Sequence, residues 1–171
     1  MNPTRTIKLS GEKLSFSASH AIVFEQPNQP GSLGLEPLHG HDFVVDVEIT
    51  GPVNALGMVI NFLVAESVLR SIIDKFNHKI LLPAKPDYFN YEQSGRQLGV
   101  RSKVDPRSWS FPLVDVCFID APNASTEAIA DDLARLYWGR LTDFGIISPA
   151  EAYQLRVTLK ESAGSSVTVE Y

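Results

Sequence analysis

Residues 39–50 read HGHDFVVDVEIT, and this stretch decides the fold. Its odd positions carry two histidines followed by apolar side chains, while most of its even positions are polar. Because successive side chains of a β-strand point to opposite faces, the alternation predicts a strand with one buried face. The predicted buried face consists of His39, His41, Phe43, Val45, Val47 and Ile49.

The segment 13–24, KLSFSASHAIVF, shows the same alternation, with serines between larger residues. Its buried face would carry Leu14, Phe16 and Ala18, and then His20. A loop rich in Gly and Pro over residues 27–37 separates the two predicted strands. If the strands pair as a hairpin, His20 lies beside His39 and His41.

Three convergent imidazoles are typical of a zinc site. His39 and His41 lie at i and i+2 on one face of a strand, and no cysteine or acidic fourth ligand is near them in sequence. Three protein ligands leave one coordination position open, which favours a catalytic over a structural zinc; nickel, copper and iron are also compatible with three histidines. The alternative is that His20, His39 and His41 are ordinary hydrogen-bonded residues at a strand start.

The remaining pattern predicts two helices and a C-terminal hairpin. Helical periodicity covers residues 61–76, with Asn61 as N-cap, and residues 125–144. The hairpin over residues 153–171 places Glu161 on its apolar face, where a carboxylate needs a partner. The order of elements predicts an α+β fold with both helices on one face of an antiparallel sheet.

Residues 83–113 fit neither helix nor strand periodicity. They mix Pro and Gly with aromatic residues, and we expect an inserted lobe or long hairpin in which residues 97–102 pair with 113–119. We find no linker or internal repeat, so residues 1–171 are expected to form a single domain carrying this insertion.

Composition excludes several classes of protein. The 171 residues are 44% hydrophobic and 20% charged, with a net charge of −5 and no basic cluster, which argues against disorder and nucleic-acid binding. The single cysteine, Cys117, forms no internal disulfide and is expected to be a small buried residue. With no membrane-spanning run or signal peptide in sight, we expect a cytoplasmic protein without a membrane partner.

Six motifs, in order along the chain, resemble the 6-pyruvoyl-tetrahydropterin synthase/QueD family: FSASH, LHGH, GMVINF, FNH, ASTEA and VTLKES. The resemblance covers about residues 12–81 and 114–171. It implies a tunnelling fold (T-fold), with an antiparallel four-stranded sheet and two helices on one face. It also implies a homo-oligomer, typically a hexamer built as a dimer of trimers, with active sites at subunit interfaces.

The resemblance also implies roles for individual residues. Zn²⁺ would be held by three histidines, a pterin ring by acidic and hydroxyl groups, and a proton would be relayed by a pair at the end of the first helix. These sets are His20, His39 and His41 for zinc; Glu161, Glu127 and Ser125 for the pterin; and Asn77 and His78 for the pair.

Two departures from the family pattern concern catalysis. Leu35 occupies the position of the family's catalytic cysteine, and Glu36 follows it, giving Glu-x-x-His-Gly-His. A branch of the family with Glu at this place cleaves the side chain of 7,8-dihydroneopterin triphosphate to give 6-hydroxymethyl-7,8-dihydropterin. Asn77 replaces the family's Asp, and an amide cannot stabilise the imidazolium form of His78 as a carboxylate would.

Two functions are therefore open. The first is a zinc-dependent pterin lyase or synthase acting on 7,8-dihydroneopterin triphosphate, with Glu36 as general base. The second is a zinc- and pterin-binding paralogue with little or no synthase activity, which Leu35 and Asn77 favour. Glu36 and Glu161 favour the enzyme.

Overall fold

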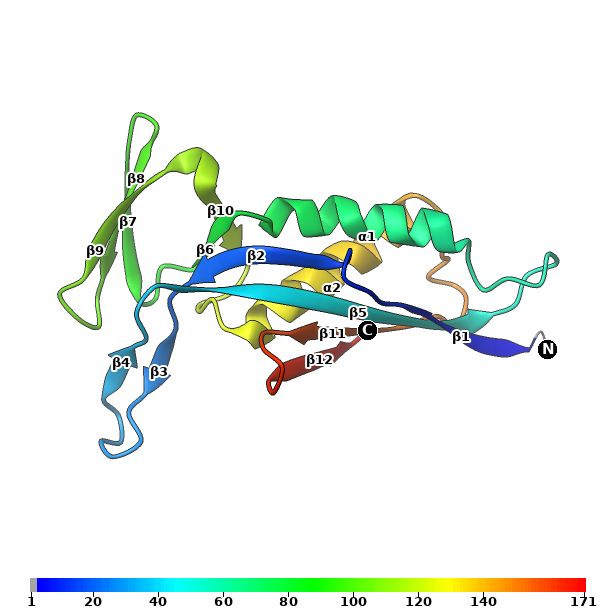
Figure 1. Cartoon of the computed structure of the whole chain (residues 1–171), viewed down its shortest axis with the longest axis horizontal. Helices are drawn as coiled ribbons and strands as arrows, with labels where there is room; N and C mark the ends of the chain where they lie inside the picture. The colour runs from blue at the N-terminus through cyan, green and yellow to red at the C-terminus, as the bar shows by residue number, and fades with distance from the viewer. Residues whose placement is uncertain (1–2) are drawn as a thin grey trace.

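A mixed sheet of seven strands forms the centre of the molecule (Figure 1), whose computed structural model describes residues 3–171. Six strands follow the order β10-β6-β2-β5-β11-β12, and β1 also pairs with β5. The bounds are β1 Thr4–Leu9, β2 Ser15–His20, β5 His39–Pro52, β6 Lys79–Pro83, β10 Val116–Ile119, β11 Gln154–Lys160 and β12 Ser166–Glu170.

Strand β5 organises the sheet. Its predicted buried face is confirmed from Phe43 to Ile49, whereas His39 and His41 at its start are partly exposed. From Phe43 to Ile49 every second side chain is fully buried, while the intervening side chains are partly exposed. β5 pairs antiparallel with β1 and β2 on one side and with β11 on the other. In the β2 register Phe16 lies opposite Phe43, and the two rings stack with centroids 5.0 Å apart.

Helices α1 (Phe62–Phe76) and α2 (Thr126–Asp143) pack on this apolar face, as the sequence predicts. Each begins at a side-chain cap. The Asn61 Oδ1 accepts from the amides of Leu63 and Val64, and the Ser125 hydroxyl accepts from the amide of Ala128. The opposite face of the sheet is polar, because the alternation places serines and carboxylates there.

The sheet differs from the prediction of four antiparallel strands. β6 runs parallel to β2, and β10 runs parallel to β6. Only Asn77 and His78 separate α1 from β6, so β6 continues in the direction of the helix and reaches the free edge of β2 parallel to it. Apolar periodicity reports burial but carries no information on strand direction.

Residues 89–112 form a separate three-stranded antiparallel sheet at one end of the molecule (Figure 1). Its strands are β7 Phe89–Ser94, β8 Gln97–Ser102 and β9 Ser108–Pro112. The predicted pairing of residues 97–102 with 113–119 is wrong: β8 pairs with β7 and β9, whereas residues 116–119 form β10 beside β6. A single 3-10 turn, Leu113–Asp115, turns the chain from β9 into β10.

A second apolar core lies between this small sheet and a short hairpin of β3 (Val23–Glu25) and β4 (Leu33–Leu35). It is distinct from the main core between the large sheet and the helices. Its buried members are Ala21, Val23, Leu35, Leu82, Phe89, Leu98 and Val100. The small sheet is therefore packed onto the hairpin that leads into β5.

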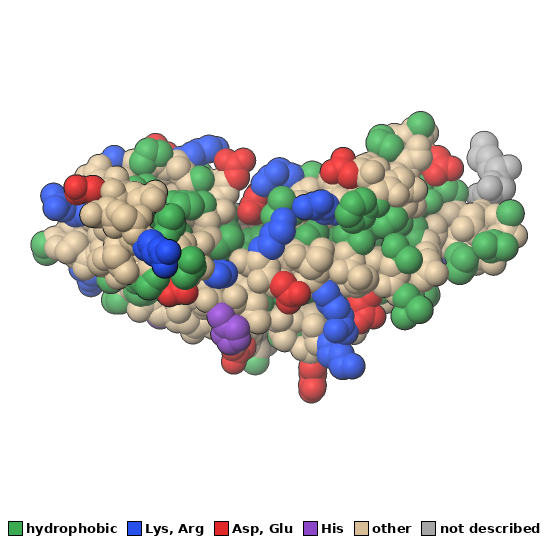
Figure 2. All heavy atoms as spheres, turned by 90° about the horizontal axis from the view of Figure 1, so that it is seen from above, with side chains coloured by type: hydrophobic (Ala, Val, Ile, Leu, Met, Phe, Trp, Pro, Cys, Tyr) green, Lys and Arg blue, Asp and Glu red, His purple; other side chains and the backbone are tan. Residues whose placement is uncertain are grey.

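Charges of both signs are interspersed on the face shown in Figure 2, without a segregated basic region on that face. Over residues 3–171, neither helix has the length and apolar character required to cross a membrane.

Candidate metal centre

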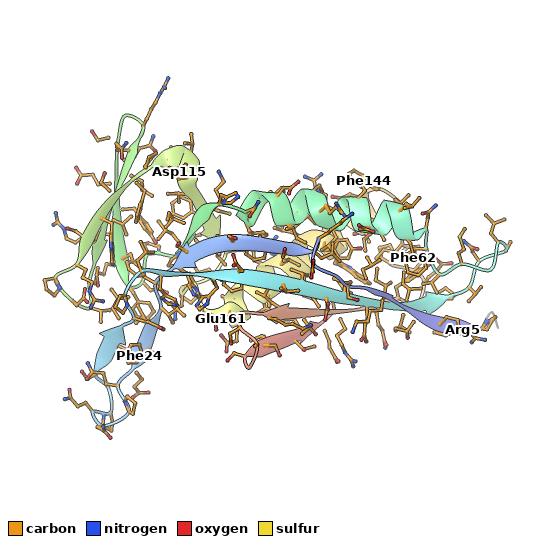
Figure 3. All side chains as sticks on the ribbon, in the orientation of Figure 1. Arg5, Phe24, Phe62, Asp115, Phe144 and Glu161 are labelled. Atoms are coloured by element: carbon orange, nitrogen blue, oxygen red, sulfur yellow. The ribbon has the colours of Figure 1, made fainter. Side chains whose placement is uncertain are left out.

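Three histidines meet where β2 ends and β5 begins. His20 and His39 face one another in the β2–β5 register, and His41 lies two residues along β5 on the same face. Glu161, just after β11, points to the same end of the sheet (Figure 3). One donor atom from each of these four residues lies within 4.8 Å of the others, so the group could hold a metal ion. The expected pairing of the strands that carry His20 and the His-Gly-His pair is confirmed, although the short β3–β4 hairpin lies between them in the chain.

The imidazole of His20 has the burial and hydrogen bonding typical of a metal ligand. It is fully buried, and its Nδ1 lies 2.8 Å from the carbonyl oxygen of Ala124. Because a carbonyl only accepts, Nδ1 carries the proton and Nε2 presents a lone pair. That Nε2 is buried and has no hydrogen-bond partner among residues 3–171. Burial lowers the pKa of His20 and outweighs the opposing effects of the Ala124 carbonyl and Glu161, which favours the neutral form that binds metals.

The orientation of His39 is also set by a backbone carbonyl. Its Nδ1 lies 2.7 Å from the oxygen of Pro37, which leaves Nε2 free to face the cluster. Metal-binding histidines commonly donate their second ring N–H in this way, because it fixes the tautomer and the ring plane. Two of the three histidines thus have the support typical of metal ligands.

Glu161 adds a carboxylate that the sequence argument did not place near the histidines. Its Oε1 lies 3.4 Å from Nε2 of His20 and 3.5 Å from Nε2 of His41. With His20 neutral, two lone pairs face each other without a proton between them. A cation between these atoms removes the repulsion, so the donor set fits a bound metal ion.

Thr126 orients Glu161, and sequence reasoning missed it. Its buried hydroxyl donates to Glu161 Oε1 at 2.8 Å. Thr126 follows Ser125 in the ASTEA motif, so its place in the motif was the available signal. Ser125 itself is occupied as the N-cap of α2.

Glu36 lies beside the cluster. Its Oε1 is 3.7 Å from Nε2 of His39, and its side chain is half exposed. Leu35 is buried in the second core, so its side chain and that of Glu36 lie in different environments. The structure therefore brings Glu36, and not Leu35, to the candidate metal site.

Asn77 and His78 lie outside the donor cluster of their own chain. The His78 amide donates to the carbonyl of Ser17, three residues before His20 in β2, which corresponds to about 10 Å along the strand. Asn77 Oδ1 accepts from the Ser17 amide at 3.0 Å. The amide side chain of Asn77 thus ties the end of α1 to β2.

His78 is exposed and has a left-handed backbone, with φ of 57°. It lines a cleft of about 550 Å³ together with Ser17, His41 and Asp42. A side chain on this cleft is accessible to a ligand or to another chain.

Glu127 also lies apart from the histidines. It is exposed near the start of α2 and lines a different pocket, with Asp131, Arg135 and Tyr171 among its neighbours. Within a single chain, only Glu161 of the three residues expected to bind the pterin is at the cluster.

Cys117 packs partly buried against the main core, in agreement with its expected structural role. Burial raises the pKa of its thiol, and Asp132 raises it further, so the nucleophilic thiolate is disfavoured.

The fold and the site together define an α+β protein with a histidine-rich, metal-compatible centre at one end of its sheet. The model of the 6-pyruvoyl tetrahydropterin synthase family matches residues 10–171. The chain therefore belongs to this family, whose members are enzymes of the pterin synthase type.

Individual relatives agree with this membership. A protein of Methanocaldococcus jannaschii, provisionally named a 6-carboxy-5,6,7,8-tetrahydropterin synthase, is 28% identical over 152 residues, which are 88% of this chain and 86% of that protein. The crystal structure of Plasmodium vivax 6-pyruvoyltetrahydropterin synthase superposes with a TM-score of 0.87 at 22% identity and covers 99% of both chains. This likeness confirms the T-fold.

A second structure of the Plasmodium vivax protein has a TM-score of 0.86, 22% identity and 99% coverage of both chains. It is described as a catalytic residue mutant in which a glutamate is replaced by alanine.

The cluster predicts specific metal binding. Protein dialysed against limiting Zn²⁺ should bind about one ion per chain, and His39→Ala should bind at least tenfold more weakly, because one of three imidazole ligands is lost. His78→Ala is the matched control and should bind like the wild type, since His78 lies outside the cluster. Metal content by mass spectrometry and competition with a zinc-binding dye measure both values. Unchanged binding in His39→Ala would show that the ligand set is wrong.

Proposed function

We propose that the chain is a zinc-dependent lyase acting on 7,8-dihydroneopterin triphosphate, with Glu36 as the general base. The observation that carries this proposal is the position of Glu36, whose Oε1 lies 3.7 Å from the candidate ligand atom of His39. The structural similarity to a Plasmodium vivax synthase described with a catalytic glutamate supports it. In the family motif, Leu35 leaves no side chain at the cysteine position that can act as a base.

His20, His39 and His41 would hold the zinc. The orphaned Nε2 of His20 and the carbonyl-bound Nδ1 atoms of His20 and His39 support this assignment. Zinc bound there would supply Lewis-acid chemistry, by which the side-chain hydroxyls of the substrate become more acidic. Three histidine ligands leave room for substrate at the metal.

Glu36 would start a retro-aldol cleavage of the side chain. It accepts the proton of the C2′ hydroxyl, whose oxygen becomes an aldehyde as the C1′–C2′ bond breaks. The bonding electron pair moves into the N5=C6 imine of the dihydropterin ring, and C1′ then takes up a proton. The products are 6-hydroxymethyl-7,8-dihydropterin and glycolaldehyde triphosphate, which together contain all atoms of the substrate.

Glu161 would bind the pterin ring. The ring presents adjacent N–H donors along one flat edge, and a carboxylate can accept two hydrogen bonds from such an edge. The Thr126 hydroxyl fixes one carboxylate oxygen and thereby limits the rotation of Glu161. Glu127 and Ser125 are assigned to the pterin by the family resemblance.

A second copy of the chain would complete the site. His78 is not one of the clustered donors of its own chain, but it is exposed and lines a cleft that also reaches His41. In a homo-oligomer with sites at subunit interfaces, such as the family's hexamer, His78 of one copy can approach the cluster of another. Asn77 next to it carries no charge, so we expect His78 to relay protons less effectively than it would beside a carboxylate.

A zinc- and pterin-binding paralogue without synthase activity is the second candidate. Leu35 and Asn77 favour it, because both remove a chemical group that the family uses. The archaeal relatives suggest a third outcome, formation of a 6-carboxy-tetrahydropterin product. Identification of the product distinguishes these functions.

Product analysis tests the role of Glu36. We expect zinc-loaded protein to convert 7,8-dihydroneopterin triphosphate to a 6-hydroxymethyl product, and Glu36→Gln to be slower by about 10²–10⁴-fold, because the base is lost. Liquid chromatography with mass spectrometry identifies the pterin. Glu25→Gln, on the neighbouring hairpin, is the control and should keep wild-type turnover. A 6-pyruvoyl or 6-carboxy product would keep the family chemistry and reject this cleavage, and bound but unchanged substrate would favour the paralogue.

Glu161→Gln separates pterin binding from metal binding. Hydrogen bonds to a charged group contribute about 1.5–3 kcal/mol, so a dihydropterin analogue should bind roughly 10- to 100-fold more weakly. Zinc content should stay near one per chain, because the three histidines remain. Calorimetry with the analogue and metal analysis of the same sample give both values. Unchanged analogue affinity would reject the pterin role, and loss of zinc would identify Glu161 as a necessary metal ligand.

Mixing two impaired variants tests the shared site. If Glu36 and His78 act from different copies, denaturing and refolding a mixture of Glu36→Gln and His78→Ala chains should restore part of the activity, because some interfaces contain both intact residues. Each variant refolded alone serves as the control. No recovery in mixed oligomers would place both residues in one chain's site.

A further inference from the structure

The peptide unit that joins Leu35 to Glu36 is held at both of its polar ends. Nη1 of Arg107 donates to the Leu35 carbonyl at 2.9 Å, and the Glu36 amide donates to the Ile22 carbonyl at 2.8 Å. These two bonds fix the plane of the peptide immediately before Glu36. They therefore fix the backbone orientation at Glu36, from which its side chain projects.

The Leu35 side chain adds an apolar anchor to the same segment. It is 7% exposed and belongs to the second core, which it shares with Phe89 of β7 and Leu98 and Val100 of β8. Because successive side chains of an extended chain point to opposite sides, burial of Leu35 against the small sheet turns Glu36 away from that sheet. Glu36 accordingly lies near His39.

Arg107 is itself positioned by its own turn. Asp105 accepts from the Arg107 amide at 3.0 Å through Oδ1, and its Oδ2 lies 3.2 Å from Nη1 of Arg107. This turn joins β8 to β9, so the guanidinium comes from the small sheet and reaches the strand β4. The contact spans 72 positions in sequence.

We propose that Arg107 is a positioning residue for Glu36, and that the three-stranded sheet of residues 89–112 is the platform that holds this carboxylate at the metal cluster. The inference rests on the proposed role of Glu36 as base and assigns a function to the small sheet. It also explains why a leucine can occupy the position before the glutamate: the side chain there anchors the segment, and the following residue performs the chemistry.

The test compares Arg107→Ala with Arg101→Ala, an exposed arginine on β8 of the same sheet. We expect Arg107→Ala to lower kcat about 10- to 100-fold with little change in KM, because a base displaced by about 1 Å loses most of its effect. Arg101→Ala should behave like the wild type. Arg107→Lys should recover part of kcat, since its ammonium can still donate to the Leu35 carbonyl.

A double variant shows whether Arg107 acts through Glu36. In the Glu36→Gln background, Arg107→Ala should cause no further loss of kcat, because the group that it positions is already absent. Additive losses would overturn the proposal, as would wild-type kcat in Arg107→Ala. If Glu36→Gln alone has no effect, the proposed base is wrong, which is a different result from an inert Arg107 variant.

Amide exchange provides a readout that does not depend on activity. The Glu36 amide is bonded to Ile22, and we expect Arg107→Ala to raise its hydrogen-exchange rate at least tenfold while amides of β5 and β11 remain protected. NMR measures these rates residue by residue. Unchanged exchange at the Glu36 amide would show that Arg107 does not hold this peptide, and this result does not depend on whether Glu36 is the base. Loss of protection at amides throughout the chain would show that Arg107 has a purely structural role in the small sheet.

Discussion

The antiparallel register of β2 and β5 is the constraint on which the site depends. Opposite His20 stands His39, and stacked phenylalanines lie four residues further into the sheet on the same face. A shift of the register by one residue would move one histidine to the polar face. Because the apolar side chains of both strands must face the helices, formation of the main core also aligns the imidazoles.

The candidate metal centre lies where the regular sheet ends, and loop backbone completes it. The carbonyls of Ala124 and Pro37 hold the rings of His20 and His39, and Thr126 at the start of α2 holds Glu161. These supports come from two separate parts of the chain, the loop before β5 and the entry of α2. A site built in this way is oriented before a ligand arrives, which reduces the reorganisation needed for binding or catalysis.

The two apolar cores support different parts of the candidate site. The main core sets the positions of the histidines through the strands, and the second core sets the position of Glu36 through Leu35. The candidate base and the candidate ligands are thus supported by different parts of the molecule, which meet at His39. The small sheet contributes no donor to the four-residue cluster. Its role is to support the segment of Leu35 and Glu36, which lies beside that cluster.

By itself, the sequence determined the two helices, the Asn61 cap, the apolar faces of β2 and β5, and the shared face of His39 and His41, because each follows from local periodicity or spacing. Tertiary structure decided what depends on distant partners. The parallel pairing of β6 with β2, the approach of Glu161 to His20, and the bond from Arg107 to Leu35 join residues 61, 141 and 72 positions apart. No local pattern encodes such contacts. Periodicity in the sequence predicts which side chains are buried, whereas the residues that each one contacts depend on the fold of the whole chain.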